Sequence, residues 1–190
     1  MELLEQRIVS DGKVLPGNVL KVGNFLNHQI DVDLVMQMGA EIARIFADTK
    51  IDKILTIETS GVAIAFAAAN YIKVPVVFAK KNKSSNIDAD TFGAPVHSFT
   101  HGNDYHAVVS KQFLKRDENV LIVDDFLANG SALKGLIDIL TQAGANCVGA
   151  AVAIEKGFQL GGDQLREQGY RIESMALIDS MEDGKIVFRR

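Results

Sequence analysis

The sequence has a single cysteine, Cys147, so a fold held together by intramolecular disulfides is excluded. It has no apolar run as long as a membrane span, and no basic, apolar and small-residue signal pattern follows Met1. Its formal net charge of −4 gives no overall attraction to nucleic acid or to an anionic membrane. No internal repeat or low-complexity linker interrupts it. These absences predict a cytoplasmic protein.

The composition that remains is that of a globular protein. Hydrophobic residues make up 47% of the chain and charged residues 23%, which argues against disorder. A chain of 190 residues can bury one sizeable core, whereas it is short for two full domains. We therefore expect residues 1–190 to form a single domain.

Buried-strand patterns alternate with helical patterns along most of the chain. The apolar runs that predict strands are 53–57, 75–79, 120–123 and 147–154, and the helical stripes are 34–46, 62–71 and 133–140. Near-continuous apolar strands separated by helices predict an α/β fold, with a mainly parallel central sheet flanked by helices. The charges at 163–168 indicate a solvated helix face, and 185–190 an edge strand.

Two regions depart from this alternation. Residues 1–30 are dense in apolar side chains but broken by Pro16 and several glycines, so we expect them to form a small hood together with residues after 155. Residues 82–104 are polar and lack a clear core face, which predicts an inserted, flexible β-ribbon or loop. Such an insertion is often a lid that excludes water.

The most informative stretch is Val120–Ala132, where an apolar run leads into two acids, a small-residue turn and a helical pattern. Gly130 in the turn tolerates positive φ, so backbone N–H groups can converge on one anion at the helix start. Asp124 and Asp125 offer acceptor-only carboxylates that suit the paired hydroxyls of a ribose. The stretch predicts a pocket for a ribose bearing a 5′-phosphate. A parallel strand that merely ends in two acids is the alternative.

Two further loops follow predicted strands, and ligands bind at the carboxyl ends of such strands. The N–H groups of Thr59, Ser60 and Gly61 are positioned to cradle a second anion, here a pyrophosphate. Lys81, in a lysine-rich run after the next strand, is suited to clamp its charge. The alternatives are an ordinary turn capped by Ser60 and a solvated edge.

The Val120–Ala132 order resembles the phosphoribosyl-diphosphate signature of the type I phosphoribosyltransferases. Together with Leu20–Asp31, the 58–61 loop, Lys80-Lys81 and Glu155–Phe158, it resembles the bacterial xanthine phosphoribosyltransferases over essentially the whole chain. The resemblance implies the type I fold and transfer of ribose 5-phosphate from 5-phosphoribosyl 1-diphosphate (PRPP) to N9 of xanthine. The products would be xanthosine 5′-monophosphate (XMP) and pyrophosphate, a step of purine salvage.

The resemblance also implies roles for individual residues. Asp124 and Asp125 would be the catalytic, ribose-facing acids, and Lys156 and Asn27 would read the 6-oxo and 2-oxo groups of xanthine, with Leu20 against the ring. The residues that would hold the 5′-phosphate of PRPP are Ala128, Asn129, Gly130, Ser131 and Ala132. Mg²⁺ is expected to arrive with the diphosphate, so no residue is assigned as a resident metal ligand. A homodimer is expected, with Lys81 reaching a shared or neighbouring pyrophosphate site.

The sequence departs from the wider superfamily at the phosphate turn. The commoner Ala-Thr-Gly-Gly-Thr is Ala-Asn-Gly-Ser-Ala here, and no acid stands at Ala128 to take the N7 proton. Xanthine reacting partly as its own anion would reduce the need for such a base. Two alternatives stay open: a transferase for guanine or hypoxanthine, and a non-catalytic PRPP-sensing regulator. The latter would need a DNA-binding module, and no basic helix-turn-helix pattern precedes the domain.

Overall fold

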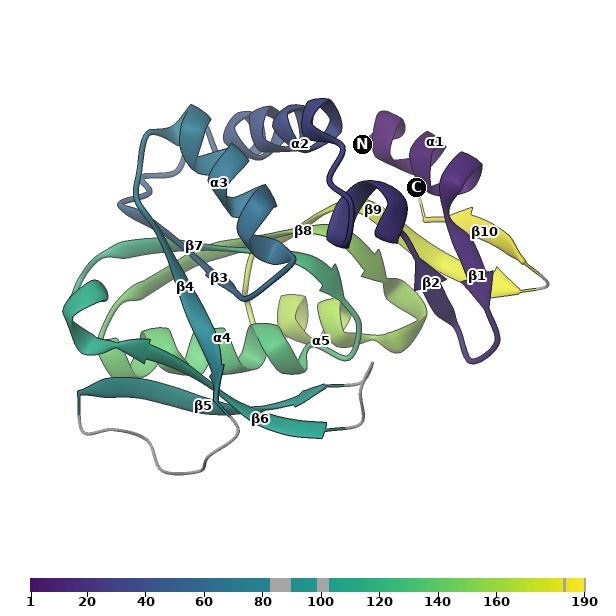
Figure 1. Cartoon of the computed structure of the whole chain (residues 1–190). Helices are drawn as coiled ribbons and strands as arrows, with labels where there is room; N and C mark the ends of the chain where they lie inside the picture. Colours follow the sequence, from purple (N-terminus) through teal and green to yellow (C-terminus); the bar gives the residue numbers. More distant parts are fainter. Residues whose placement is uncertain (83–89, 99–102, 183, 190) are drawn as a thin grey trace.

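The structure is a computed structural model that describes residues 1–82, 90–98, 103–182 and 184–189. Its centre is an eight-stranded sheet in the order β10-β9-β8-β7-β3-β4-β6-β5 (Figure 1). Strands β4, β3, β7, β8 and β9 run parallel, and β5, β6 and β10 are antiparallel to their neighbours. The strands are β3 Lys53–Ile57, β4 Val76–Asn82, β5 Thr91–Ser98, β6 Asn103–Ser110, β7 Asn119–Leu127, β8 Asn146–Lys156, β9 Ile172–Glu182 and β10 Lys185–Phe188.

Helices cover both faces of the sheet, as the alternation predicts. Helices α2 (Val32–Ile45) and α3 (Gly61–Ile72) lie on one face, and α4 (Ser131–Ala143) and α5 (Gly161–Glu167) lie on the other (Figure 1). Each face has its own apolar core. The predicted α/β fold with a mainly parallel sheet is therefore confirmed. No helix in the described part of the chain combines the length and apolarity needed to cross a membrane.

The first residues form a small layer beside β9 and β10. It consists of α1 (Glu2–Asp11), a hairpin of β1 (Lys13–Leu15) and β2 (Val19–Lys21), and the π-helix η1 (Gly23–Asn27). The amino group of Met1 donates to the carbonyl of Met175 in β9, which ties this layer to the sheet. The side chain of Asp31 then accepts from Leu34 N (3.1 Å) and caps α2. This layer is the region predicted to form the hood.

The predicted β-ribbon is present in its described part. Strands β5 and β6 pair antiparallel, and their inward-facing residues are Ala94, Val96, Ala107 and Val109. The hairpin packs over the outer face of α4 (Figure 1), where Gln142 Nε2 donates to Gly93 O at 2.9 Å. Of the segment predicted to be flexible, 83–89 and 99–102 lie outside the described residues. The 3₁₀ turns η2 (Lys111–Phe113) and η3 (Gly157–Gln159) follow β6 and β8.

Candidate active site

The two acids lie within β7, near its carboxyl end. The sequence places them after the strand, but β7 continues to Leu127 because the neighbouring β8 keeps pairing with it as far as Glu155. Asp124 is only 4% exposed, and its Oδ1 accepts from Asp125 N at 2.9 Å. Burial and the negative charge of Asp125 raise the pKa of Asp124 well above its usual range. A bound cation or hydrogen-bond donor would therefore stabilise the ionised form of Asp124.

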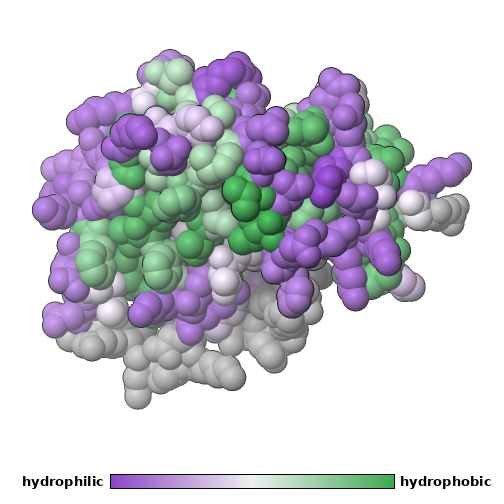
Figure 2. Space-filling model, turned by 45° about the horizontal axis from the view of Figure 1, so that its top comes forward, coloured by the Kyte–Doolittle hydropathy of each residue, from purple (hydrophilic) through white to green (hydrophobic). Residues whose placement is uncertain are grey.

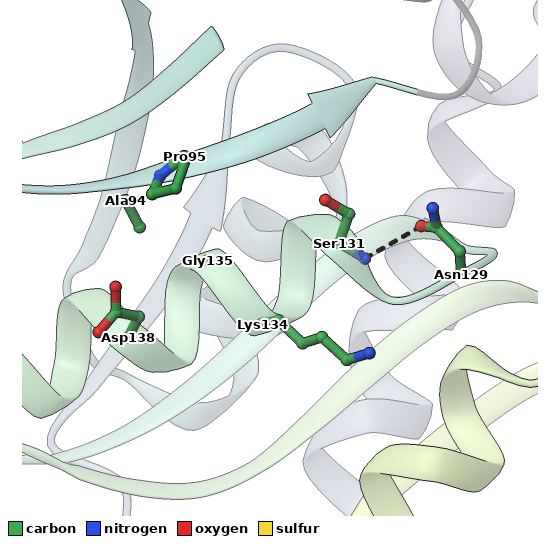
Figure 3. A pocket seen from close by; sticks show the side chains of 7 residues that line it. All are labelled: Ala94, Pro95, Asn129, Ser131, Lys134, Gly135 and Asp138. Atoms are coloured by element: carbon green, nitrogen blue, oxygen red, sulfur yellow. Dashed lines mark hydrogen bonds between the residues drawn. The ribbon is translucent and has the colours of Figure 1, made fainter. Parts of the chain in front are cut away.

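The residues predicted to bind the 5′-phosphate, Ala128 to Ala132, follow β7 directly and are called the phosphate turn after that prediction. Gly130 adopts φ +83°, which directs the chain from the strand into α4 at Ser131. Asn129 Oδ1 accepts from Ser131 N at 3.0 Å and stabilises this turn (Figure 3). The N-cap position itself is Gly130, which has no side chain to cap α4. The hydroxyl of Ser131 instead accepts from His97 N of β5 at 2.9 Å, which leaves its own proton free to donate.

A cavity opens beside this turn, between the hairpin and α4. Its volume is about 390 Å³, and it is lined from β5 by Ala94 and Pro95 (Figure 3). The turn and the first turns of α4 contribute the remaining lining residues, which are Asn129, Ser131, Lys134, Gly135 and Asp138. Phosphate-turn side chains thus face open space on this side of the helix start.

The predicted pyrophosphate loop, Thr59 to Gly61, meets the acid pair. It joins β3 to α3, and a Cβ added at Gly61 would lie 2.9 Å from Asp124 Oδ1 and would collide with Thr56 Oγ1. Only glycine fits at this contact. Ser60 precedes α3 without making a side-chain cap, so the capped-turn alternative lacks its hydrogen bond. The loop and Asp124 therefore form one surface.

Lys81 is held beside this surface from β4. Its backbone N–H donates to Glu58 Oε1 at 2.6 Å, and its Nζ lies 5.2 Å from the centre of the Tyr105 ring. Its charge acts to lower the pKa of Asp124, although burial and Asp125 outweigh it. Sequence reasoning missed Tyr105, whose pKa burial and the charge of Asp124 raise to about 12. Its place on an inserted hairpin left no local signal.

Of the predicted base-reading residues, Asn27 contacts the acid pair. Asn27, at the end of η1, donates from Nδ2 to Asp125 Oδ2 at 3.5 Å. Lys156, at the end of β8, donates to Asn18 O at 2.9 Å and lies 5.8 Å from the centre of the Phe126 ring. Burial lowers the pKa of Lys156.

Leu20, the third predicted base-reading residue, is 7% exposed in β2. It belongs to the same apolar core as Phe25 and Leu26 of η1. Asn18, two residues earlier, accepts the hydrogen bond from Lys156. Like Tyr105, Phe126 is an aromatic residue beside a predicted site lysine that the sequence analysis did not identify.

Acidic and imidazole groups do not gather elsewhere into a metal site. Among the described residues, no group of three or more His, Cys, Asp or Glu is arranged to hold an ion. Asp124 and Asp125 supply two carboxylates, which fits Mg²⁺ that brings substrate phosphate oxygens as its other ligands.

The chain matches the family model described as the phosphoribosyl transferase domain over residues 21–168. Xanthine phosphoribosyltransferases of Lachnoclostridium phytofermentans and Bifidobacterium adolescentis are each 54% identical to it; both alignments cover 100% of this chain, and they cover 98% and 100% of those proteins.

Solved adenine phosphoribosyltransferases share the fold. The Trypanosoma brucei protein superposes with a TM-score of 0.73 at 15% identity, over 90% of this chain and 78% of its own. The Giardia lamblia protein superposes with a TM-score of 0.72 at 19% identity, over 90% of this chain and 96% of its own. At these identities the likeness establishes the type I fold and not the base. Family model and full-length relatives agree with the sequence prediction, and the chain belongs to the phosphoribosyltransferase family, among its xanthine phosphoribosyltransferases.

Proposed function

We infer that the protein transfers the 5-phosphoribosyl group of PRPP to N9 of xanthine, with XMP and pyrophosphate as products. The observation that carries this inference is that the phosphate turn, the acid pair and the Thr59–Gly61 loop meet at the carboxyl ends of β7 and β3. This is where ligands bind in open α/β sheets. The full-length identity to xanthine phosphoribosyltransferases supports the choice of base.

The donor would lie along these carboxyl ends. Its 5′-phosphate would accept hydrogen bonds from the N–H groups of residues 128–132 and from the Ser131 hydroxyl. Asp124 and Asp125 would accept from the ribose hydroxyls, and the loop at Thr59, with Lys81, would receive the diphosphate. Mg²⁺, held by the acid pair and by donor oxygens, would supply positive charge that favours departure of the diphosphate.

The base would lie between Asn27, Lys156 and the apolar surface to which Leu20 contributes. In the structure the Lys156 ammonium group donates to Asn18 O and the Asn27 amide nitrogen donates to Asp125 Oδ2, so both side chains already act as hydrogen-bond donors. Lys156 would donate to the 6-oxo group, and the Asn27 amide would read the 2-oxo group. A 6-amino group would face the Lys156 donor with a donor of its own, which disfavours adenine.

The reaction replaces one bond at the anomeric carbon with another. The bond from C1′ to the diphosphate oxygen breaks with its electron pair, the N9 lone pair forms the new bond to C1′, and xanthine loses one proton to solvent. Positive charge develops on the ribose in the transition state, as in glycosyl transfers generally. Asp124 and Asp125 would stabilise this charge, while Lys81 would stabilise the negative charge on the departing pyrophosphate.

We also propose that the protein is a homodimer that associates through α3 and β4. Phe66, Tyr71 and Phe78 leave 68%, 46% and 44% of their surface exposed there. Figure 2 shows hydrophobic side chains gathered on this side of the molecule, and such gatherings commonly mark protein interfaces. Lys81 follows Phe78 on β4, so association would bring it near a neighbouring pyrophosphate site. Phe66→Asp should convert the dimer into monomers in analytical ultracentrifugation; a monomeric wild type would refute the proposal.

The test of function is a pyrophosphate-release assay with PRPP, Mg²⁺ and, in turn, xanthine, guanine, hypoxanthine and adenine. Xanthine should be strongly preferred, and Asn27→Ala should lower kcat/KM for xanthine on the order of 100-fold, because a group that reads the 2-oxo edge is lost. Asn24→Ala is the matched control, since Asn24 lies on the same π-helix but donates to Asp11 O at 3.1 Å.

Three results would redirect the proposal. Preference for guanine or hypoxanthine would reassign the base. An equal loss for Asn27→Ala and Asn24→Ala would remove Asn27 from base reading. No turnover with any base, despite PRPP binding, would indicate a non-catalytic regulator that senses PRPP.

A further inference from the structure

A fully buried carboxylate lies directly beside the base-binding lysine. Glu155 precedes Lys156 at the end of β8 and is 0% exposed. Successive side chains of a strand point to opposite faces, so Glu155 faces α5 while Lys156 faces the Asn18 side. A charge so deeply buried is expensive unless it is fully paired. Because Lys156 faces the other way, the Glu155 carboxylate has to be paired by groups on the α5 side of β8.

Arg166 of α5 supplies the pairing. Its Nη1 and Nη2 donate to Glu155 Oε1 and Oε2 at 2.8 and 2.6 Å, a bidentate arrangement, and the Ser174 hydroxyl also donates to Glu155 Oε2. Nη2 of the same guanidinium donates to Ile172 O at 3.2 Å. The pair thus ties the last turn of α5 to β8 and to the start of β9.

Two glycines transmit this constraint to the phosphate turn. Gly162 lies so close to the Glu155 carboxylate that any Cβ would collide with Oε1. Gly161 lies against the turn itself, where a Cβ would collide with Ala128 O and with the backbone between Asn129 and Gly130. Its N–H donates to Ala128 O at 3.1 Å. The carboxylate, the double glycine and the phosphate turn are therefore in direct, consecutive contact.

We propose that Glu155, held by Arg166, is a positioning residue for the phosphate turn: through Gly162 and Gly161 it fixes the backbone N–H groups that bind the 5′-phosphate of PRPP. This inference rests on the proposed function. An anion site made of N–H groups depends on their fixed directions, and a displacement of about 1 Å can cost on the order of 100-fold in rate. The buried pair supplies that rigidity from behind the turn.

The test compares Glu155→Gln with Glu118→Gln. Glu118 also pairs with a buried cation, since Lys53 Nζ lies 2.8 Å from its Oε2, but it precedes the amino end of β7, away from the phosphate turn. Steady-state kinetics should give the KM for PRPP and for xanthine separately, and calorimetry should measure the binding of ribose 5-phosphate.

Glu155→Gln should raise the KM for PRPP and the Kd for ribose 5-phosphate by about tenfold or more, because the turn loses its fixed position. The KM for xanthine should change by less than about threefold, since Lys156 faces the other side of β8. Glu118→Gln should leave all three constants within about twofold of the wild type, as expected for a site remote from the ligand.

Two further variants separate positioning from folding. Glu155→Gln with Arg166→Gln removes both charges, and this double variant should recover part of the PRPP affinity lost in either single variant. Gly161→Ala leaves the ion pair intact but pushes on the turn, and it should reproduce the rise in KM for PRPP even if Glu155→Gln does not fold.

The proposal is overturned if Glu155→Gln and Gly161→Ala bind PRPP as the wild type does. It is equally overturned if Glu118→Gln weakens PRPP as much as Glu155→Gln. A wild type that binds ribose 5-phosphate but turns over no base would instead contradict the proposed function, and the calorimetric comparison would still test the positioning role.

Discussion

The two ends of β7 hold carboxylates in opposite states. Glu118, just before the strand, binds Lys53 Nζ through both oxygens at 2.9 and 2.8 Å. Burial raises the pKa of Glu118 while the Lys53 hydrogen bond lowers it, and the net shift is downward. Asp124, near the other end, has its pKa raised by burial and by Asp125. At the amino end of β7 the Glu118 carboxylate is paired with a cation, whereas at the carboxyl end the Asp124 carboxylate is not, in the part of the chain that the structure describes.

The difference separates stability from binding within one strand. At the amino ends Lys53 also donates to Phe113 O at 2.6 Å, so its charge is fully satisfied. At the carboxyl ends the Thr56 hydroxyl is buried without a partner among the described residues, next to Gly61 and Asp124. Uncompensated groups of this kind reduce stability and leave hydrogen-bonding capacity for a ligand.

The largest effect is expected from Asp124→Asn. Losing one ribose-facing charge should lower kcat on the order of 1000-fold, within the range for groups that act directly in catalysis. The same change removes a buried charge, so the free energy of unfolding at pH 8 should rise by about 1 kcal/mol. Enzyme assays and denaturant unfolding without ligand or Mg²⁺ measure both. A variant that is inactive and also less stable would show that Asp124 is a structural residue.

Lys53→Met should produce the opposite pattern. Removing one partner of a buried ion pair costs about 3 kcal/mol, because Glu118 loses its counter-charge. Since the pair lies at the amino ends of the strands, kcat and both KM values should remain within about twofold of the wild type. Urea unfolding with parallel kinetics tests this, and a selective rise in the KM for PRPP would contradict the separation.

The pH dependence of stability should differ in sign between the two ends. The folded-state pKa of Glu118 is lowered, so its contribution is present above the unfolded value of about 4.3 and is lost as pH falls through the folded value. The pKa of Asp124 is raised, so its cost develops as pH rises above about 3.9.

Unfolding measurements from pH 3 to pH 8 can separate the two contributions. The stability advantage of Asp124→Asn should grow as pH rises, and the stability deficit of Glu118→Gln should shrink as pH falls. A constant difference across the range, for either variant, would show that the charge is not the cause.

The smallest effect is expected from Thr56→Val. It replaces a buried hydroxyl without a partner by a methyl group, which should raise the free energy of unfolding by about 1 kcal/mol. If the hydroxyl meets a ligand, kcat/KM should fall by less than about tenfold. Thermal unfolding and the pyrophosphate assay measure the two changes. A loss of stability would show that the hydroxyl has a partner in solution.

Local patterns in the sequence predicted most of the sheet and the turn that leads from β7 into α4. The strand at 53–57 is found where it was predicted, and the phosphate turn leads from β7 to α4 at Ser131 as expected. The N–H directions, the small residues and the helix start are all encoded in one short stretch, so no distant contact is needed to recognise them. The family and its fold followed from that stretch and its neighbours.

Contacts between segments that are distant in the chain could not be predicted from local sequence patterns. The 163–168 charges were interpreted as a solvated face, and this was wrong for Arg166, which pairs with the buried Glu155. A helix of charged residues has the same pattern whether one of them points into solvent or reaches a carboxylate on a strand. Tyr105 was missed because only pairing of β6 with β4 brings it beside Lys81.

The order of strands has a consequence for the kinetics of ligand exchange. β7 has paired neighbours on both sides, whereas β5 is an edge strand whose His97 N binds Ser131 Oγ. Opening the β5–β6 hairpin breaks contacts only at the border of the sheet, so it costs far less free energy than opening β7. Amide hydrogens of β5 should exchange with solvent much faster than those of β7. The hairpin can therefore open locally while the strand that bears the acids stays folded.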